Sequence, residues 1–132
     1  MFNSRARVLT SLFIFVATII LKPAVGAGGT TIRGWVSDEG CARGRASSGT
    51  YTGTNPDCAR QCVAKGAKIV LILPEQKRLL VVENQEAVRA NIGNFVEVNG
   101  TVDDHAGTIH VDTMKLVTIG RAMCDLPKKS AN

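Results

Sequence analysis

Residues 67–83 read AKIVLILPEQKRLLVVE, and this segment carries the strongest structural signal in the chain. Its first part, residues 67–73, is a nearly continuous apolar run of the length typical of a buried strand. Residues 74–77 supply the turn, and residues 78–83 form a second apolar run of strand length. The segment therefore predicts a β-hairpin with a buried first strand.

Alternating segments flank this hairpin on both sides. Residues 30–37 (TTIRGWVS) alternate polar and apolar side chains, and Gly34 within them indicates a bend or bulge. Residues 94–102 (NFVEVNGTV) and 108–117 (TIHVDTMKLV) alternate in the same way on either side of the turn DDHAG. We expect one further strand before the hairpin and a second hairpin after it.

The remaining segments predict a long loop and two short helices. Residues 42–56 (ARGRASSGTYTGTNP) are rich in Gly, Ser and Thr without periodicity, which indicates a loop. Asp57 is suited to cap a short helix over residues 58–65. Residues 84–91 (NQEAVRAN) suit a second short helix, capped by Asn84.

This order of elements predicts a mostly β fold, a small five-stranded OB-like Greek-key barrel with two short helices. A simple β-sandwich or meander is the alternative, because patterns predict element type better than topology. We expect a single domain over residues 28–132, with its core over about residues 30–118 and a C-terminal tail at 119–132.

The first 27 residues resemble a secretory signal peptide. Residues 1–7 are basic, residues 8–21 are apolar, and small residues precede a cleavage point between Ala27 and Gly28. The apolar part is shorter than the roughly 20 residues that a membrane-spanning helix needs. We expect export to the periplasm or out of the cell. The alternative is an anchor in the inner membrane through an uncleaved leader.

The charge of the chain lies largely in this leader. The formal net charge is +5, but the leader holds three basic residues and no acidic one, which leaves +2 for the rest. Only three aromatic residues, Trp35, Tyr51 and Phe95, follow the leader. A single-stranded nucleic-acid binder needs a basic groove and stacking aromatics, so we expect no nucleic-acid partner.

All four cysteines, Cys41, Cys58, Cys62 and Cys124, follow the leader. An even number in a small exported chain predicts disulfide staples. The spacing of Cys58 and Cys62 puts both on one helix face, and a bridge within one helical turn is geometrically awkward. The simplest interpretation pairs one of them with Cys41 and the other with Cys124.

Two alternatives to this pairing stay open. Four cysteines converging on zinc is one, although the spacing lacks the usual zinc knuckle. A free, reactive thiol pair is the other, although a thioredoxin-type motif has two residues between its cysteines and not three. With disulfides as the leading interpretation, we expect no metal and no cofactor.

Other polar groups give weaker signals. His105 and His110 lie near several aspartates, but a solvated turn and an outward strand position explain them. No catalytic triad, carboxylate pair or phosphate-binding loop is present in the sequence, so we predict no enzyme. The 42–56 loop carries Arg43, Arg45 and Tyr51, and the corresponding loop of OB-like barrels often lines a ligand site.

Two segments resemble a family of small exported bacterial domains of OB-like fold and unknown function. They are GWVSDEGC at residues 34–41 and CARQCVAKGA at residues 58–67, and the likeness extends over roughly residues 31–117. The resemblance implies an exported module without an assigned activity. Members often carry a histidine four residues after the first cysteine; Arg45 stands there in this chain, which argues against a metal.

We therefore expect a non-enzymatic exported module that binds a ligand or associates with the cell envelope. Its partner would be a small ligand, a glycan or an envelope protein, with membrane contact only through an uncleaved leader. The alternative function is a thiol- or metal-handling exported protein that uses Cys41, Cys58 and Cys62.

Overall fold

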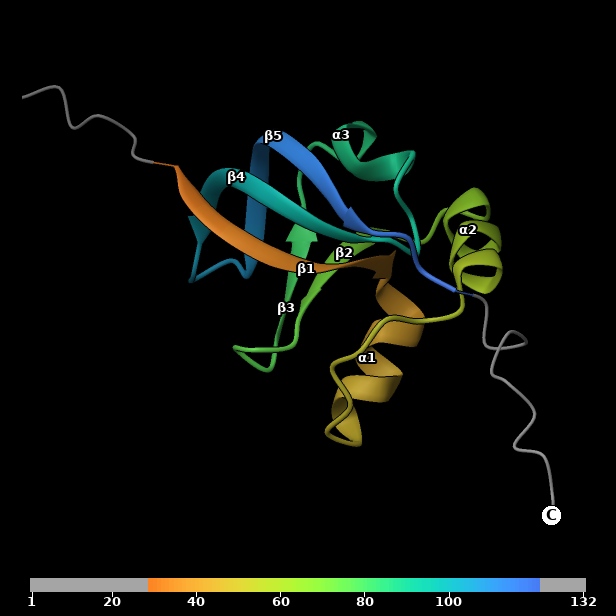
Figure 1. Cartoon of the computed structure of the whole chain (residues 1–132). Coiled ribbons are helices and arrows are strands. Elements are labelled where there is room, and N and C mark those ends of the chain that lie inside the picture. Colours follow the sequence, from red (N-terminus) through yellow and green to blue (C-terminus); the bar gives the residue numbers. More distant parts are fainter. Residues whose placement is uncertain (1–28, 122–132) are drawn as a thin grey trace, which may run out of the picture.

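The computed structural model describes residues 29–121 (Figure 1). The predicted signal peptide and Cys124 lie outside these residues. The described chain is mostly β, with five strands: β1 (Thr30–Asp38), β2 (Ile69–Leu73), β3 (Arg78–Val82), β4 (Phe95–Asp103) and β5 (Thr108–Thr118). It also forms three short helices: α1 (Glu39–Ser47), α2 (Pro56–Ala64) and α3 (Glu86–Arg89).

The five strands form one mixed sheet that closes into a ring in the order β1-β2-β3-β5-β4. All neighbouring pairs are antiparallel except β3 with β5. The ring closes because β1 pairs with β4 along its first part and with β2 along its last part. At Gly34, a Cβ atom would lie 2.6 Å from the carbonyl oxygen of Ile72, so this crowded stretch of β1 requires glycine.

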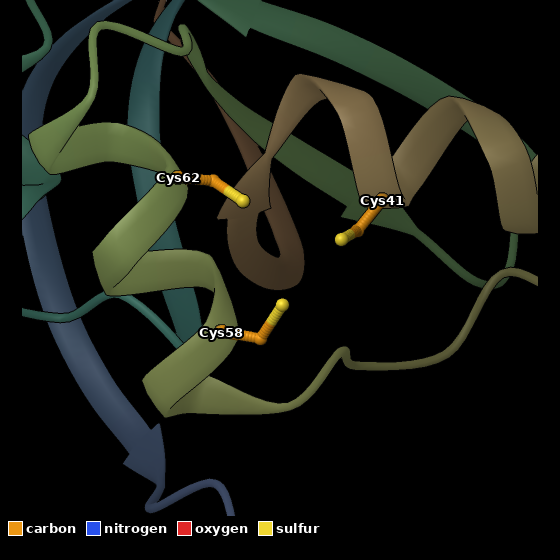
Figure 2. Close-up of side chains that lie close together, drawn as sticks. All are labelled: Cys41, Cys58 and Cys62. Atoms are coloured by element: carbon orange, nitrogen blue, oxygen red, sulfur yellow. The ribbon is translucent and has the colours of Figure 1, made fainter.

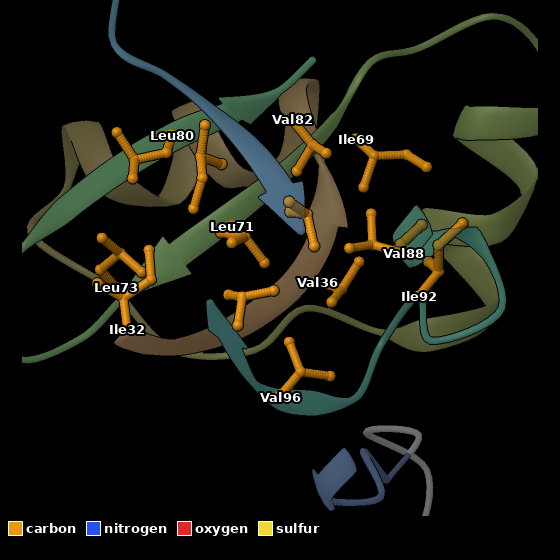
Figure 3. Close-up of a cluster of buried hydrophobic side chains, with 14 of the residues drawn as sticks. Ile32, Val36, Ile69, Leu71, Leu73, Leu80, Val82, Val88, Ile92 and Val96 are labelled. Carbon is orange, nitrogen blue, oxygen red and sulfur yellow. The ribbon is translucent and has the colours of Figure 1, made fainter. Parts of the chain in front are cut away.

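The hydrophobic core fills the inside of the ring and extends beneath α2 and α3 (Figure 3). All five residues of β2 are buried, as the apolar run predicted. Val96, Val98 and Ile109 come from the second hairpin and are fully buried. Each buried aliphatic side chain of this size stabilises the fold by about 1.5–3 kcal/mol relative to an exposed one.

The predicted strands and hairpins are confirmed, whereas the loop prediction for residues 42–56 is wrong over its first part. There the chain forms α1, which gives three helices in place of the two predicted. Asp38 caps this helix by accepting the backbone N–H of Cys41 at 2.9 Å. Glu39 and Arg43 form a salt bridge along it at 2.7 Å.

Both predicted helices form, but the predicted residues do not cap them. Asn55, not Asp57, caps α2, and Pro56 is its first residue. Asn84 does not cap α3; its side chain bonds both backbone groups of Val111 and so ties the region before α3 to β5. In the described part of the chain, no helix is long and apolar enough to cross a membrane.

Candidate metal-binding site

Three cysteines meet between α1 and α2. The sulfur atoms of Cys41, Cys58 and Cys62 all lie within 4.8 Å of one another. Figure 2 shows Cys41 on α1 facing the two cysteines of α2. Cys41 and Cys62 are half-buried and Cys58 is exposed, so the cluster is open to solvent on the Cys58 side.

The end of β1 places Cys41. Asp38 is both the last residue of β1 and the cap of α1, which makes Cys41 the third residue of the helix. The backbone N–H of Glu39 donates to the carbonyl oxygen of Lys68 at 2.9 Å, just before β2 begins. These bonds fix the first turn of α1 to the sheet.

The cap and the buried face of α2 place the other two cysteines. The Asn55 side chain accepts the backbone N–H of Asp57 at 2.9 Å and that of Cys58 at 3.2 Å. Ala59 and Val63 are buried in the core and hold one face of α2 against it. Cys58 and Cys62, four residues apart, therefore share another face, which turns toward α1.

A buried hydrogen bond joins the starts of the two helices. It connects the hydroxyl groups of Ser37 and Thr54, both of which are buried. Ser37 directly precedes the cap of α1, and Thr54 directly precedes the cap of α2. The bond therefore holds the first turns of both helices, and with them Cys41 and Cys58, at a fixed separation.

The Asp38 carboxylate is the most unusual polar group near the cluster. Its side chain belongs to a residue only 1% exposed. One oxygen, Oδ2, accepts the N–H of Cys41, whereas Oδ1 is buried and has no hydrogen-bond partner in the described part of the chain. A buried polar atom without a partner costs about 1–3 kcal/mol, and more when it is charged.

The surroundings of the thiols oppose their deprotonation. Burial, followed by the charge and hydrogen bonding of Asp38, raises the pKa of Cys41 from 9.0 to about 12. Burial, followed by the charges of Asp38 and Cys58, raises the pKa of Cys62. Additional negative charge is therefore unfavourable in the cluster. A bound cation would stabilise the thiolates and so lower the pKa of these cysteines.

The predicted disulfide staples are not present in the described part of the chain. Cys41, Cys58 and Cys62 are free thiols there, and Cys124, the fourth disulfide candidate, lies outside it. Three sulfurs that converge on one point cannot all pair with each other. Cys58 and Cys62 lack the spacing of a zinc knuckle, but Cys41 reaches the cluster from a separate helix.

The predicted ligand-loop residues make contacts within α1 and the segment that follows it. Arg43 pairs with Glu39, and Arg45 donates to the Thr52 hydroxyl at 2.6 Å. Tyr51 packs against a small apolar cluster beneath α1 that includes Ala42. A ligand site formed by these three residues stays a prediction.

The two histidines lie outside the cysteine cluster. His105 and His110 are both exposed, and His110 Nδ1 is 3.7 Å from a carboxylate oxygen of Glu83. Cys41, Cys58 and Cys62 form the group of metal-type ligands found among the described residues, and neither histidine belongs to it. The expectation that they lie on a turn and an outward strand position is confirmed.

No family model, curated protein or solved structure matches this chain. The likeness to a family of exported bacterial domains therefore stays a prediction from the two cysteine-containing segments.

Proposed function

We propose that this protein is an exported, non-enzymatic binding module that holds one soft metal ion between α1 and α2. The ligands are the thiolates of Cys41, Cys58 and Cys62. The observation that carries the proposal is the convergence of their three sulfurs within 4.8 Å of one another. A tetrahedral zinc ion, with Zn–S bonds of about 2.3 Å, holds its sulfurs about 3.8 Å apart. Side-chain rotations that bring the sulfur atoms about 1 Å closer together would close the cluster around an ion.

Metal binding accounts for the electrostatics better than thiol–disulfide exchange does. A thiol that attacks disulfides needs a lowered pKa, because the thiolate is the nucleophile. Here the pKa values of Cys41 and Cys62 are raised. A metal ion displaces the protons directly, and the resulting thiolates of Cys41 and Cys58 lie in the first turns of helices, where the helix dipole favours negative charge.

The ligand type restricts the metal. Thiolate sulfur selects Zn²⁺ and Cu(I), whereas Mg²⁺ and Ca²⁺ prefer oxygen. The proposal thus replaces the unspecified small ligand, glycan or envelope protein with an ion of this class.

The order of strands around the ring supports the finer fold proposal of an OB-like Greek-key barrel. Export to the periplasm or out of the cell is proposed from the leader at residues 1–27, which carries a basic segment, an apolar segment and a cleavage point.

The test is the metal content of the full chain produced with its own leader. We expect the reduced, purified protein to retain one Zn²⁺ per chain after removal of free metal. Serine at any of the three cysteine positions should abolish or strongly reduce retention. Gln61→Ser, an exposed change on the same helix, should leave it unchanged.

The opposite result is equally clear. If the protein as isolated has no thiol that reacts with an alkylating agent, and the reduced form retains neither Zn²⁺ nor Cu(I), the cysteines are structural disulfides. The proposal is then wrong.

A further inference from the structure

Asp38 carries a charge that its capping role does not require. Asn, Ser and Asp cap helices about equally well, so a neutral side chain would serve. Asp38 is instead a carboxylate at 1% exposure. Among the described residues, no basic side chain forms a salt bridge with it. An ionised carboxylate without a partner is among the most costly groups to bury.

The two oxygens of this carboxylate have different surroundings. Oδ2 accepts the backbone N–H of Cys41 at 2.9 Å, so the carboxylate lies directly beside a proposed metal ligand. Oδ1 is buried and has no hydrogen-bond partner among residues 29–121. The charge of Asp38 contributes to the raised pKa of both Cys41 and Cys62, so the carboxylate lies near these two thiols, although it is not itself a member of the three-cysteine group. Cys58, in contrast, marks its exposed side.

We propose that Asp38 Oδ1 is the fourth ligand of the bound metal, which completes a tetrahedral site of three sulfurs and one oxygen. This inference rests on the proposed function. Oδ2 would keep the first turn of α1 in place while Oδ1 binds the ion. The metal would supply the positive charge that the buried carboxylate lacks.

A site of this composition discriminates between the two ions that thiolates attract. Carboxylate oxygen is an established ligand of Zn²⁺, at about 2.0–2.2 Å. Cu(I) is soft and is selected by thiolate and thioether ligands, so an oxygen contributes little to its binding. Asp38 would therefore strengthen the binding of Zn²⁺ much more than that of Cu(I).

The first experiment counts ligands in the unmodified protein. X-ray absorption at the zinc edge of the Zn²⁺-loaded full chain should give three sulfurs at about 2.3 Å and one oxygen. Four sulfurs would assign the fourth position to Cys124 and would overturn the role of Asp38. Failure of the chain to bind Zn²⁺ or Cu(I) at all would overturn the proposed function itself, and the two failures are thus distinguishable.

The second experiment separates Asp38 from a water molecule that supplies the oxygen. Asp38→Asn keeps a capping oxygen but removes the charge. We expect its Zn²⁺ affinity to fall at least about 10–100-fold, the range known for residues that support metal ligands. Its Cu(I) affinity should fall far less, because an oxygen ligand contributes little to the binding of that ion. Asp38→Ser, a second good cap, should behave in the same way.

Two outcomes would overturn the role of Asp38 as fourth ligand and leave the three-cysteine metal site intact. Unchanged Zn²⁺ affinity in Asp38→Asn would show that the carboxylate does not reach the ion. An equal loss of affinity for both ions, together with a lower unfolding temperature of the metal-free variant, would show that Asp38 is only a structural cap.

Discussion

Two buried hydroxyl groups hold the metal-binding helices in register at the scale of single residues. Ser37 and Thr54 bond to each other directly before the caps of α1 and α2. Ser37→Ala removes one partner and leaves the Thr54 hydroxyl buried and unsatisfied. We expect a loss of about 1–3 kcal/mol in the free energy of unfolding, measured by urea denaturation of the metal-free protein.

Ser47→Ala is the matched control for this change. The Ser47 hydroxyl is exposed and donates to the carbonyl oxygen of Gly44 within α1. Its removal should change the free energy of unfolding by less than about 0.5 kcal/mol. Equal effects of the two substitutions would contradict the role assigned to the Ser37–Thr54 bond.

The raised pKa of Cys41 predicts slow chemistry at that residue. With a pKa of about 12, its thiolate fraction at pH 8 is roughly a thousandfold smaller than that of a thiol with the ordinary value of 9.0. Because the thiolate is the reactive form, iodoacetamide should label Cys41 much more slowly in the folded, metal-free protein than in urea. Timed labelling followed by peptide mass spectrometry measures both rates. Equal rates would contradict a raised pKa of Cys41.

At the scale of elements, Gly93 determines how closely the start of α2 approaches the chain ahead of β4. Its φ angle is +92°, and an added Cβ would collide with the side chain of Pro56, the first residue of α2. Gly93→Ala should therefore lower stability by more than the roughly 1–3 kcal/mol that a left-handed alanine costs. It should also weaken Zn²⁺ binding, because α2 must shift and carries Cys58 and Cys62.

Gly49 offers a control with the same backbone requirement. Its φ angle is +80°, and among the described residues no atom beyond its immediate chain surroundings lies within 4 Å of the place that a Cβ would occupy. Gly49→Ala should lower stability through the backbone cost alone and leave Zn²⁺ affinity unchanged. Similar metal affinities of the two variants would show that the position of α2 does not depend on this contact.

The strands were predictable from sequence because their signal is local. Two apolar runs and three alternating segments are enough to predict five strands. The helix α1 was missed because its local signal is poor: Gly40 and Gly44 both lower helix propensity. It forms because Asp38 caps it, Glu39 pairs with Arg43, and Ala42 is buried against the sheet.

At the scale of the whole molecule, the site depends on contacts that no local pattern contains. The spacing of Cys58 and Cys62 correctly predicted a shared helix face. The approach of Cys41 requires that the end of β1 meets the start of α2, which is a property of the closed sheet. The unpaired oxygen of Asp38 could not be predicted either, because the sequence indicates a helix-capping residue but not its burial.

The raised pKa of Cys41 also links the stability of the whole metal-free molecule to pH. The folded state holds the Cys41 proton more tightly than the unfolded state does, with pKa values of about 12 and 9.0. Between these values the unfolded chain has released a proton that the folded chain still binds. The free energy of unfolding must therefore fall as the pH rises from about 9 toward 12, and this contribution is fully present below pH 9.

The stability of the metal-loaded protein should show the opposite dependence on pH at acidic pH values. Zn²⁺ must displace thiol protons, so its stabilisation should decrease as the pH falls. Urea midpoints measured across both ranges, with and without Zn²⁺, test the two slopes. Cys41→Ser removes the titrating group, so the difference between it and the parent protein measures the contribution of Cys41 together with its coupling to Cys58 and Cys62. Parallel curves for the two proteins above pH 9 would contradict the Cys41 linkage, and a Zn²⁺ effect independent of pH would contradict thiolate coordination.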